Sequence, residues 1–281
     1  MNVNKKIIRQ HVIEKRMKFL NILKKKNYGL NNRNKIIQNI ITRNRIKTSY
    51  PLKNNYNIII PLNIFQTWHT KNLPTTMAKS VELIKKTNPR FNHELFDDDD
   101  CREFIKNNFN PDVLNAFDRL VPGAYKADLW RYCILYIKGG IYLDIKYMPI
   151  NGFRFVTLSE KEHWVLDVDN NGIYNALIVA KAGNQILLKA INQIVEHVKN
   201  RYYGSSNLEP TGPLLLSRFF SSDQKRGLDM KHNFYNSFDN RFILYNNYHI
   251  FKSYSDYLME HGQNQKTEHY SELWKKRQIY R

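Results

Sequence analysis

Residues 125–148 read YKADLWRYCILYIKGGIYLDIKYM, and this stretch decides the fold. Apolar side chains surround residues 125–137 on nearly every side, which predicts a buried helix. Lys138-Gly139-Gly140 ends the helix because glycine adopts the left-handed conformation at helix ends, and residues 141–148 are predicted to form a strand. A helix, a glycine turn and a strand make one α/β unit.

The segments around this unit alternate in the same way. Further strands are predicted at 58–68, 92–96, 164–168 and 173–180, and further helices at 77–87, 101–108 and 185–199. This alternation predicts an α/β protein with a mainly parallel, Rossmann-like sheet and helices on both of its faces. The run of four aspartates at 97–100 is predicted to cap the helix that follows it.

Charge divides the chain near residue 57. The 281 residues carry a formal net charge of +19, and residues 1–57 hold 15 Lys and Arg against the single acid Glu14. We therefore predict a basic, partly helical N-terminal extension at 1–57 and a globular domain at 58–281. The extension is either a solvated tail that reflects the codon bias of an AT-rich organism or virus, or a contact to an anionic membrane surface, nucleic acid or an acidic partner.

Composition also limits the location of the protein. No stretch has the roughly 20 apolar residues that a transmembrane helix needs, and the start shows no secretory signal peptide, so we expect neither. Two cysteines, Cys101 and Cys133, cannot build a disulfide framework. These features predict a cytoplasmic protein, located in the host cytoplasm or the virion if it is viral.

Ionisable side chains lie within the apolar unit. In the predicted strand, Tyr142, Asp144 and Lys146 share one face, and a carboxylate near a strand end lies where α/β sheets bind ligands. Asp128 and Arg131 lie inside the apolar helix, where an unpaired buried charge would cost several kcal/mol. They are therefore either paired with each other, as i, i+3 neighbours, or bound to a polar ligand.

Four motifs resemble glycosyltransferase family 32, the DXD-containing sugar transferases. This family includes fungal mannosyltransferases and capsular and giant-virus glycosyltransferases, and is related to clostridial toxin glucosyltransferases. Residues 127–132 (ADLWRY) and 139–144 (GGIYLD) resemble its signature ADLxRYxxLYxxGGxYLDxD. Residues 60–68 (IPLNIFQTW) resemble its opening IPKxIHQTW, with Phe65 where His is usual, and residues 211–213 resemble its TGP turn. The matches keep the order of the family and span residues 58–220.

The resemblance implies a GT-A nucleotide-diphospho-sugar transferase fold. It also implies transfer of a hexose from a nucleoside diphosphate sugar to a glycan or glycoprotein acceptor, with retained configuration. Residues 269–274 resemble a terminal loop that closes over the diphosphate, although the end of an amphipathic helix explains them as well. The implied donor-binding residues are Gln66, Thr67, Trp68, Tyr125, Asp128, Arg131, Gly140, Tyr142, Asp144, Asp167, Asp169, Asn175, Gly212 and Trp274. The implied catalytic residues are Asp128, Arg131 and Asp144, to which the charge of Lys146 adds a fourth candidate, and the implied ligands of a divalent cation, Mn²⁺ or Mg²⁺, are Asp144 and His269.

Lys146 departs from the signature, because it replaces the second DXD carboxylate. Its ammonium group could neutralise the diphosphate without a metal, or Asp144 could hold a metal with other carboxylates such as Asp167 and Asp169. Asp167 and Asp169 are otherwise residues of a turn, or bind sugar hydroxyls. A working enzyme is the favoured interpretation. The alternative is an inactive sugar-transferase-like module whose basic extension binds nucleic acid or membrane.

Overall fold

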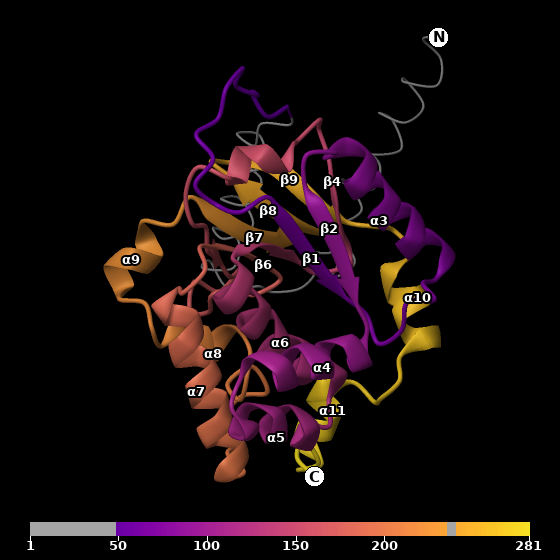
Figure 1. The fold of residues 1–281 in the computed structure, drawn as a ribbon, viewed down its shortest axis with the longest axis vertical. Helices are drawn as coiled ribbons and strands as arrows, with labels where there is room; N and C mark the ends of the chain where they lie inside the picture. The colour runs from indigo at the N-terminus through magenta and orange to yellow at the C-terminus, as the bar shows by residue number, and fades with distance from the viewer. Residues whose placement is uncertain (1–48, 235–239) are drawn as a thin grey trace, which may run out of the picture. The chain divides into compact units, whose positions relative to one another are not determined.

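The computed structural model describes residues 49–234 and 240–281 (Figure 1). Residues 1–48 of the predicted, partly helical extension fall outside the described residues. The strands are β1 (Asn63–Thr67), β2 (Asn92–Phe96), β3 (Gly140–Leu143), β4 (Tyr147–Pro149), β5 (Val165–Leu166), β6 (Leu177–Ala180), β7 (Met230–Phe234), β8 (Arg241–Tyr245) and β9 (Tyr248–Ser253). The helices are α3 (Thr75–Thr87), α4 (Asp98–Asn108), α5 (Pro111–Arg119), α6 (Gly123–Lys138), α7 (Gln185–Lys199), α8 (Pro213–Ser217), α9 (Ser222–Arg226), α10 (Tyr257–Asn264) and α11 (Tyr270–Lys275). One 3₁₀ helix spans Phe155–Leu158.

The strands form two sheets. The first has the order β2-β1-β3-β6, in which β1 is parallel to both β2 and β3, and β6 is antiparallel to β3. The second has the order β4-β9-β8-β7-β5 and is antiparallel except where β5 pairs with β7. The predicted α/β class is confirmed, but only the first sheet is mainly parallel.

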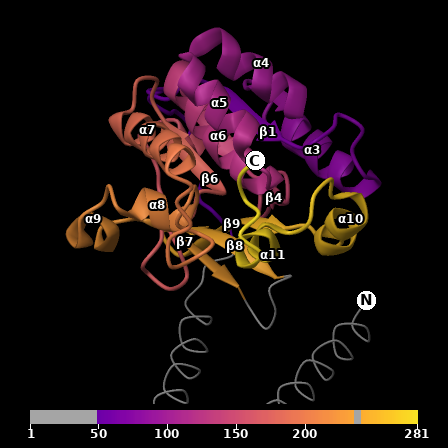
Figure 2. The same cartoon turned by 90° about the horizontal axis from the view of Figure 1, so that it is seen from below.

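Both faces of the first sheet are buried. Phe65, Tyr142 and Ile178 face the core formed with helices α4 to α7. Their neighbours Ile64 and Ile141 face a second core, formed largely with the other sheet. Figure 2 shows helices α4 to α7 on one side of β1 and strands β7 to β9 on the other. Helices therefore lie on both faces, as predicted, but on the opposite face α3 shares the cover with the second sheet.

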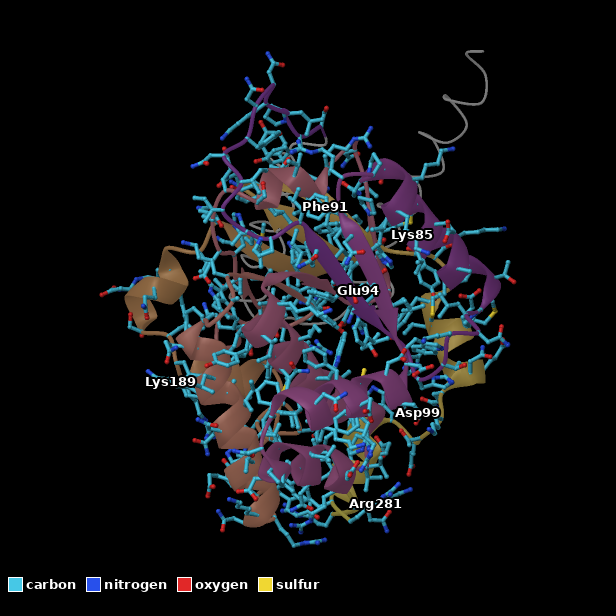
Figure 3. All side chains as sticks on the ribbon, viewed as in Figure 1. Lys85, Phe91, Glu94, Asp99, Lys189 and Arg281 are labelled. Carbon is cyan, nitrogen blue, oxygen red and sulfur yellow. The ribbon has the colours of Figure 1, made fainter. Side chains whose placement is uncertain are left out.

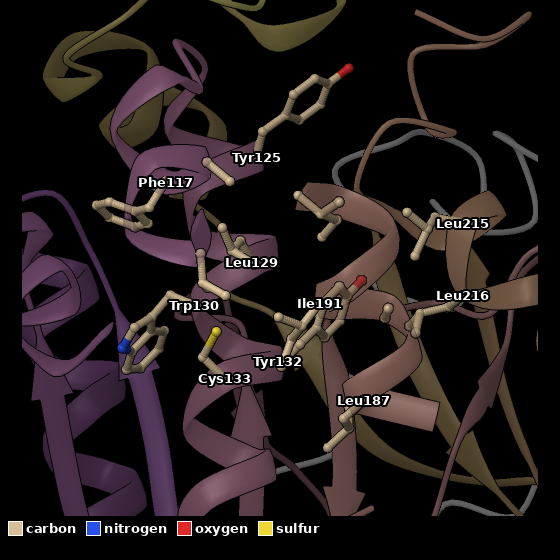
Figure 4. Packing of buried hydrophobic residues seen from close by; sticks show 14 of the residues in the cluster. Phe117, Tyr125, Leu129, Trp130, Tyr132, Cys133, Leu187, Ile191, Leu215 and Leu216 are labelled. Carbon is tan, nitrogen blue, oxygen red and sulfur yellow. The ribbon is translucent and has the colours of Figure 1, made fainter. Parts of the chain in front are cut away.

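Helix α6 is buried, as its sequence predicts. Leu129, Trp130 and Cys133 are fully buried, and α6 packs against α7 (Figure 4). Gly139 ends the helix with φ +60°, and a Cβ atom there would lie 2.6 Å from the backbone nitrogen of Ala182. The glycine turn is thus required both by the backbone conformation and by the close approach of the neighbouring loop.

The strand predicted at 141–148 is interrupted. β3 ends at Leu143, the chain turns at residues 144–146, and β4 then pairs with β9 in the second sheet. Asp144 lies at this crossing, where its backbone N–H donates to the carbonyl of Ala176 over 2.7 Å and its carbonyl accepts from Tyr147. Asp144 and Lys146 are therefore brought together by a turn, not by strand alternation.

Other strands are shorter than predicted, and three were missed. β5 and β6 each keep only part of the predicted segment, whereas α7 has the predicted bounds. No strand was expected at β7, β8 or β9. One signal was present, since Asn246 and Asn247 both have positive φ and join β8 to β9 as a two-residue hairpin loop requires.

The described end of the N-terminal segment contacts the body of the fold. The ring of Tyr50 stacks on Tyr245 with a centroid distance of 5.5 Å and meets the edges of Phe153 and Tyr248. Across residues 49–234 and 240–281, no helix combines the length and apolar character needed to cross a membrane.

Candidate functional site

A group of charged side chains lies where parallel strands β1 and β3 end. Asp144 directly follows β3, and Trp68 directly follows β1. The crevice beyond the carboxyl ends of adjacent parallel strands is where open α/β sheets bind ligands. The position of the site therefore follows from the topology of the first sheet.

Two carboxylates and two cations meet there. The ammonium of Lys146 donates to Oδ2 of Asp144 over 2.5 Å, and Nη1 of Arg131 lies 3.2 Å from Oδ1 of the same carboxylate. Nη2 of Arg131 lies 3.2 Å from Oδ1 of Asp128, so the i, i+3 pair within the helix is also formed. We call these four side chains the charge cluster.

The pKa shifts of the two acids run in opposite directions. Burial raises the pKa of Asp144, but Lys146 and Arg131 outweigh this effect and hold the pKa below its ordinary value. Burial also raises the pKa of Asp128, and there Arg131 does not fully compensate, so the pKa stays above its ordinary value. Burial lowers the pKa of Lys146, but Asp144 together with Tyr174 and Tyr257 outweighs this effect and holds the pKa above its ordinary value, so this amine stays charged.

Asp128 is fixed by neutral partners as well. It accepts hydrogen bonds from the side-chain amide of Asn175 over 2.8 Å and from the hydroxyl of Thr211 over 2.7 Å. Arg131 in turn donates to the backbone carbonyl of Asn175 over 2.7 Å. These bonds hold α6 against the loop before β6 and the loop before α8. Gly212 permits the second approach, since a Cβ atom there would lie 3.6 Å from Asp128 Oδ2 and 3.2 Å from the Leu208 carbonyl.

Tyr142 contacts two members of the charge cluster, Asp144 and Arg131. Its hydroxyl donates to Oδ1 of Asp144 over 2.7 Å, and the guanidinium of Arg131 lies 4.3 Å above its ring. Gly140 lies two residues earlier in β3 in a crowded backbone position, where a Cβ atom would come within 2.8 Å of the carbonyl of Asn63. The hydroxyl of Tyr125 donates to the carbonyl of Asn207 over 2.6 Å.

The three residues at the end of β1 have different surroundings. Gln66 is fully buried, and its amide bonds the carbonyl of Leu143 and the ring of His93. The hydroxyl of Thr67 donates to the carbonyl of Phe96. Trp68 lies beside the ring of His261, and its buried indole N–H has no hydrogen-bond partner in the described structure.

Asp167 and Asp169 lie in the turn after β5. Asp167 accepts from the backbone N–H of Val168 and from Nδ1 of His232, each over 2.8 Å. Asp169 accepts from the backbone N–H of Asn171 over 2.9 Å. These bonds match the interpretation of both aspartates as turn residues, and no recorded contact joins either of them to Asp144.

His269 and Trp274 bond groups other than the charge cluster, although Tyr270 between them lies close enough to interact with the charges of Lys146 and Asp128. Nδ1 of His269 accepts from the backbone N–H of Ser271 and so caps α11, and no recorded contact joins this ring to Asp144. The indole of Trp274 donates to the carbonyl of Tyr203 over 2.7 Å, so this N–H already has a partner. Residues 269–274 therefore form the start and body of a short helix.

Four residues near Lys146 were not foreseen from the sequence. The ammonium of Lys146 lies 5.4 Å from the ring centroid of Tyr147 and 5.5 Å from that of Tyr174, and the hydroxyls of these tyrosines bond each other. Burial raises the pKa of Tyr257 to about 12, and its charge interactions include Lys146, Asp144 and Arg241. Tyr257 is in α10 and Arg241 is in β8, and neither element was expected from the sequence.

A divalent metal does not fit this set of groups. Oδ1 of Asp144 faces Tyr142 and Arg131, and Oδ2 faces Lys146, so both carboxylate oxygens already have donors. In the part of the chain that the structure describes, no three His, Cys, Asp or Glu side chains are grouped so as to hold a metal ion. Mg²⁺ and Mn²⁺ bind carboxylate, carbonyl and water oxygens, and the ammonium of Lys146 beside Asp144 opposes them.

Comparisons with known proteins agree with the motifs. Residues 74–165 match the family model described as "Glycosyltransferase sugar-binding region containing DXD motif". An uncharacterized glycosyltransferase of Acanthamoeba polyphaga mimivirus is 43% identical over 89 residues, which cover 31% of this chain and 36% of that protein. Inositol phosphoceramide mannosyltransferase 3 of Schizosaccharomyces pombe is 29% identical over 181 residues, which cover 63% of this chain and 49% of that protein. The chain thus spans half or less of the length of these relatives.

A solved structure also resembles the chain. The PaToxG glycosyltransferase superposes with a TM-score of 0.44 at 19% identity, covering 57% of this chain and 67% of that one.

Proposed function

We propose that this chain transfers a hexose from a nucleoside diphosphate sugar. Its residues 74–165 match the sugar-binding region of DXD-containing glycosyltransferases, and fungal mannosyltransferases are among its relatives. The acceptor is a glycan or a glycoprotein, and the anomeric configuration is retained. The observation that supports this proposal most directly is the charge cluster, because its paired carboxylates and cations lie beyond the ends of parallel strands β1 and β3.

The cluster suits the transfer chemically. The bond between C1 of the sugar and the diphosphate oxygen breaks, and its electron pair goes to the diphosphate. The acceptor hydroxyl oxygen bonds to C1, and its proton goes to the departing diphosphate. Negative charge therefore develops on the leaving group, where fixed cations stabilise it. We assign Asp128 and Arg131 to the donor sugar, Asp144 to the ribose and Trp68 to the base.

Glycosyltransferases that contain the DXD motif generally use a divalent metal, Mn²⁺ or Mg²⁺. Because the groups around Asp144 do not fit such an ion, no step of the proposed transfer passes through one.

Two further proposals concern the location of the protein and its basic extension. The two cysteines are free and buried, which suits a cytoplasmic location, and the basic residues of 1–57 would contact an anionic surface.

Thermal unfolding of the purified chain with a panel of UDP- and GDP-sugars tests the function. A donor at about 100 times its dissociation constant adds roughly 2.7 kcal/mol, or about 5 to 10 °C for a protein near this size. We expect one sugar nucleotide to raise the melting temperature by this amount and the free sugar to have no effect. If no sugar nucleotide raises it, the proposed function is wrong.

A further inference from the structure

We propose that Lys146, with Arg131 beside it, neutralises the donor diphosphate in place of a divalent cation, so that donor binding and transfer proceed without metal. This inference rests on the proposed function. It concerns how the same site holds the diphosphate, and it departs from the metal-dependent DXD arrangement of the family.

The position of Lys146 supports the proposal. Residue 146 is where the signature has its second carboxylate, and its ammonium bonds the one DXD carboxylate that remains, over 2.5 Å. A metal bound to Asp144 would have to displace this ammonium or lie beside it. An ammonium group at this place supplies positive charge where the metal of a complete DXD motif would supply it.

Two N–H donors of the Lys146 ammonium have no hydrogen-bond acceptor among the described residues. An ammonium has three N–H donors, and Oδ2 of Asp144 is the acceptor recorded for it among the described residues. The rings of Tyr147 and Tyr174 lie over 5 Å from Nζ, and their hydroxyls bond each other. Only 10% of the Lys146 side chain is exposed, so water satisfies the other donors poorly. Anionic oxygens of a diphosphate would satisfy them.

A further cation, Arg241, lies near the charge cluster. Asp128 and Asp144 balance Arg131 and Lys146 in number. Arg241 adds a further cation, close enough to Lys146 to oppose its protonation, and it interacts with Tyr174, Tyr147 and Tyr257. The tyrosines that surround Lys146 therefore also adjoin Arg241. A diphosphate bound here would meet cations from α6, from the turn after β3 and from β8.

The test measures binding of UDP and GDP to the full-length chain by calorimetry, and turnover of the donor found in the panel, each in excess EDTA and in excess Mn²⁺. For the wild type we expect affinity and turnover to agree within about twofold between the two conditions. A nucleotide affinity that requires Mn²⁺ would overturn the inference and leave the proposed function standing. If neither nucleotide binds in either condition, the proposed function itself fails.

Two substitutions sharpen the test. Lys146→Asp rebuilds the D-x-D motif, and we expect its nucleotide affinity to be low in EDTA and to rise at least about tenfold with Mn²⁺. Lys146→Met removes the charge but keeps the apolar length of the side chain, and turnover should fall on the order of 10²-fold to 10³-fold in both conditions. The inference is contradicted if Lys146→Met turns over donor as fast as the wild type. It is also contradicted if Lys146→Asp binds the nucleotide as tightly as the wild type and Mn²⁺ does not change that affinity.

Lys189→Asp is the matched control. Lys189 is exposed on α7, on the outer surface of the molecule (Figure 3), and the substitution makes the same change in net charge. We expect its nucleotide affinity to equal that of the wild type in both conditions. Thermal unfolding of each variant shows whether it is folded, and if Lys146→Asp does not fold, the wild type and Lys146→Met decide the question.

Discussion

At the scale of single residues, Asp144 depends on its neighbours. Its Oδ1 accepts a hydrogen bond from the hydroxyl of Tyr142 and pairs with Arg131, and its Oδ2 accepts a hydrogen bond from Lys146. A carboxylate in this setting does more than bind a ligand, because it also compensates the charges of Lys146 and Arg131. Its removal therefore affects stability as well as chemistry.

Asp144→Asn tests this double role. We expect turnover to fall by at least about 10²-fold, because the ribose contact and the orientation of Lys146 are both lost. We also expect the free energy of unfolding at pH 7 to drop by about 3 kcal/mol, because two buried cations lose their shared anion. Urea denaturation and donor turnover measure the two effects.

Asp99→Asn is the control for this prediction. Asp99 is exposed in the first turn of α4 (Figure 3), and we expect a change within about 0.5 kcal/mol and normal turnover. Unchanged stability in Asp144→Asn would show that Lys146 and Arg131 do not need this carboxylate in the unliganded protein.

At the scale of elements, helix α10 is joined to the start of α3. The carboxylate of Glu260 accepts hydrogen bonds from the backbone N–H groups of Thr76 over 2.8 Å and Met77 over 3.0 Å. Pro74 precedes α3 and makes no side-chain cap, so Glu260 acts as the cap from 184 residues away in sequence. Burial raises the pKa of Glu260, but these bonds and the hydroxyl of Tyr254 outweigh burial and hold it below its ordinary value.

Glu260→Gln is predicted to destabilise the protein in a pH-dependent way. At pH 7 we expect a loss of about 1 to 2 kcal/mol, because the charged cap becomes neutral. Since folding lowers this pKa, the contribution is complete above the unfolded value near 4.3 and disappears as pH falls through the folded value. The stability difference between wild type and variant should thus shrink below about pH 4 in urea titrations.

The exposed Glu82 on α3 provides the matched control. Glu82→Gln should change the free energy of unfolding by no more than about 0.5 kcal/mol at pH 7. A difference between wild type and Glu260→Gln that stays constant down to pH 3 would mean that the charge of Glu260 does not stabilise α3.

At the scale of the whole molecule, the residues that belong to the globular domain begin before residue 57. Tyr50 packs on Tyr245, Phe153 and Tyr248, and Lys53 pairs with Glu160. The part of the segment that contributes to the fold therefore includes residues 50–53. A truncation that separates the basic charge from the domain should leave these residues in place.

Two truncations test this division. Removal of residues 1–48 should leave donor turnover unchanged, whereas removal of residues 1–57 should lower the free energy of unfolding by about 1 to 3 kcal/mol, because the aromatic contacts of Tyr50 are lost. Tyr50→Ala in the full chain should reproduce most of this loss, and Leu52→Ala, at a side chain 48% exposed, should not. Loss of turnover on removal of residues 1–48 would favour the basic extension as part of the active protein.

The sequence by itself determined the local elements. Helix α6, its glycine end, helix α7 and the cap formed by Asp97 and Asp100 at the start of α4 all follow the predicted pattern. Periodicity, caps and glycine conformation act over a few neighbouring residues, so the residue order specifies them directly. The motifs that carry the family resemblance are local for the same reason.

Only the tertiary structure decided how distant groups meet. The break between β3 and β4 depends on the pairing of β4 with β9, about 100 residues later, and the contact of Asp144 with Arg131 depends on how α6 packs on β3. The approach of Arg241 and Tyr257 to Lys146 likewise needs β8 and α10 in place. Such contacts arise from packing between elements far apart in the chain, which no local pattern encodes, and they set the charge of the site.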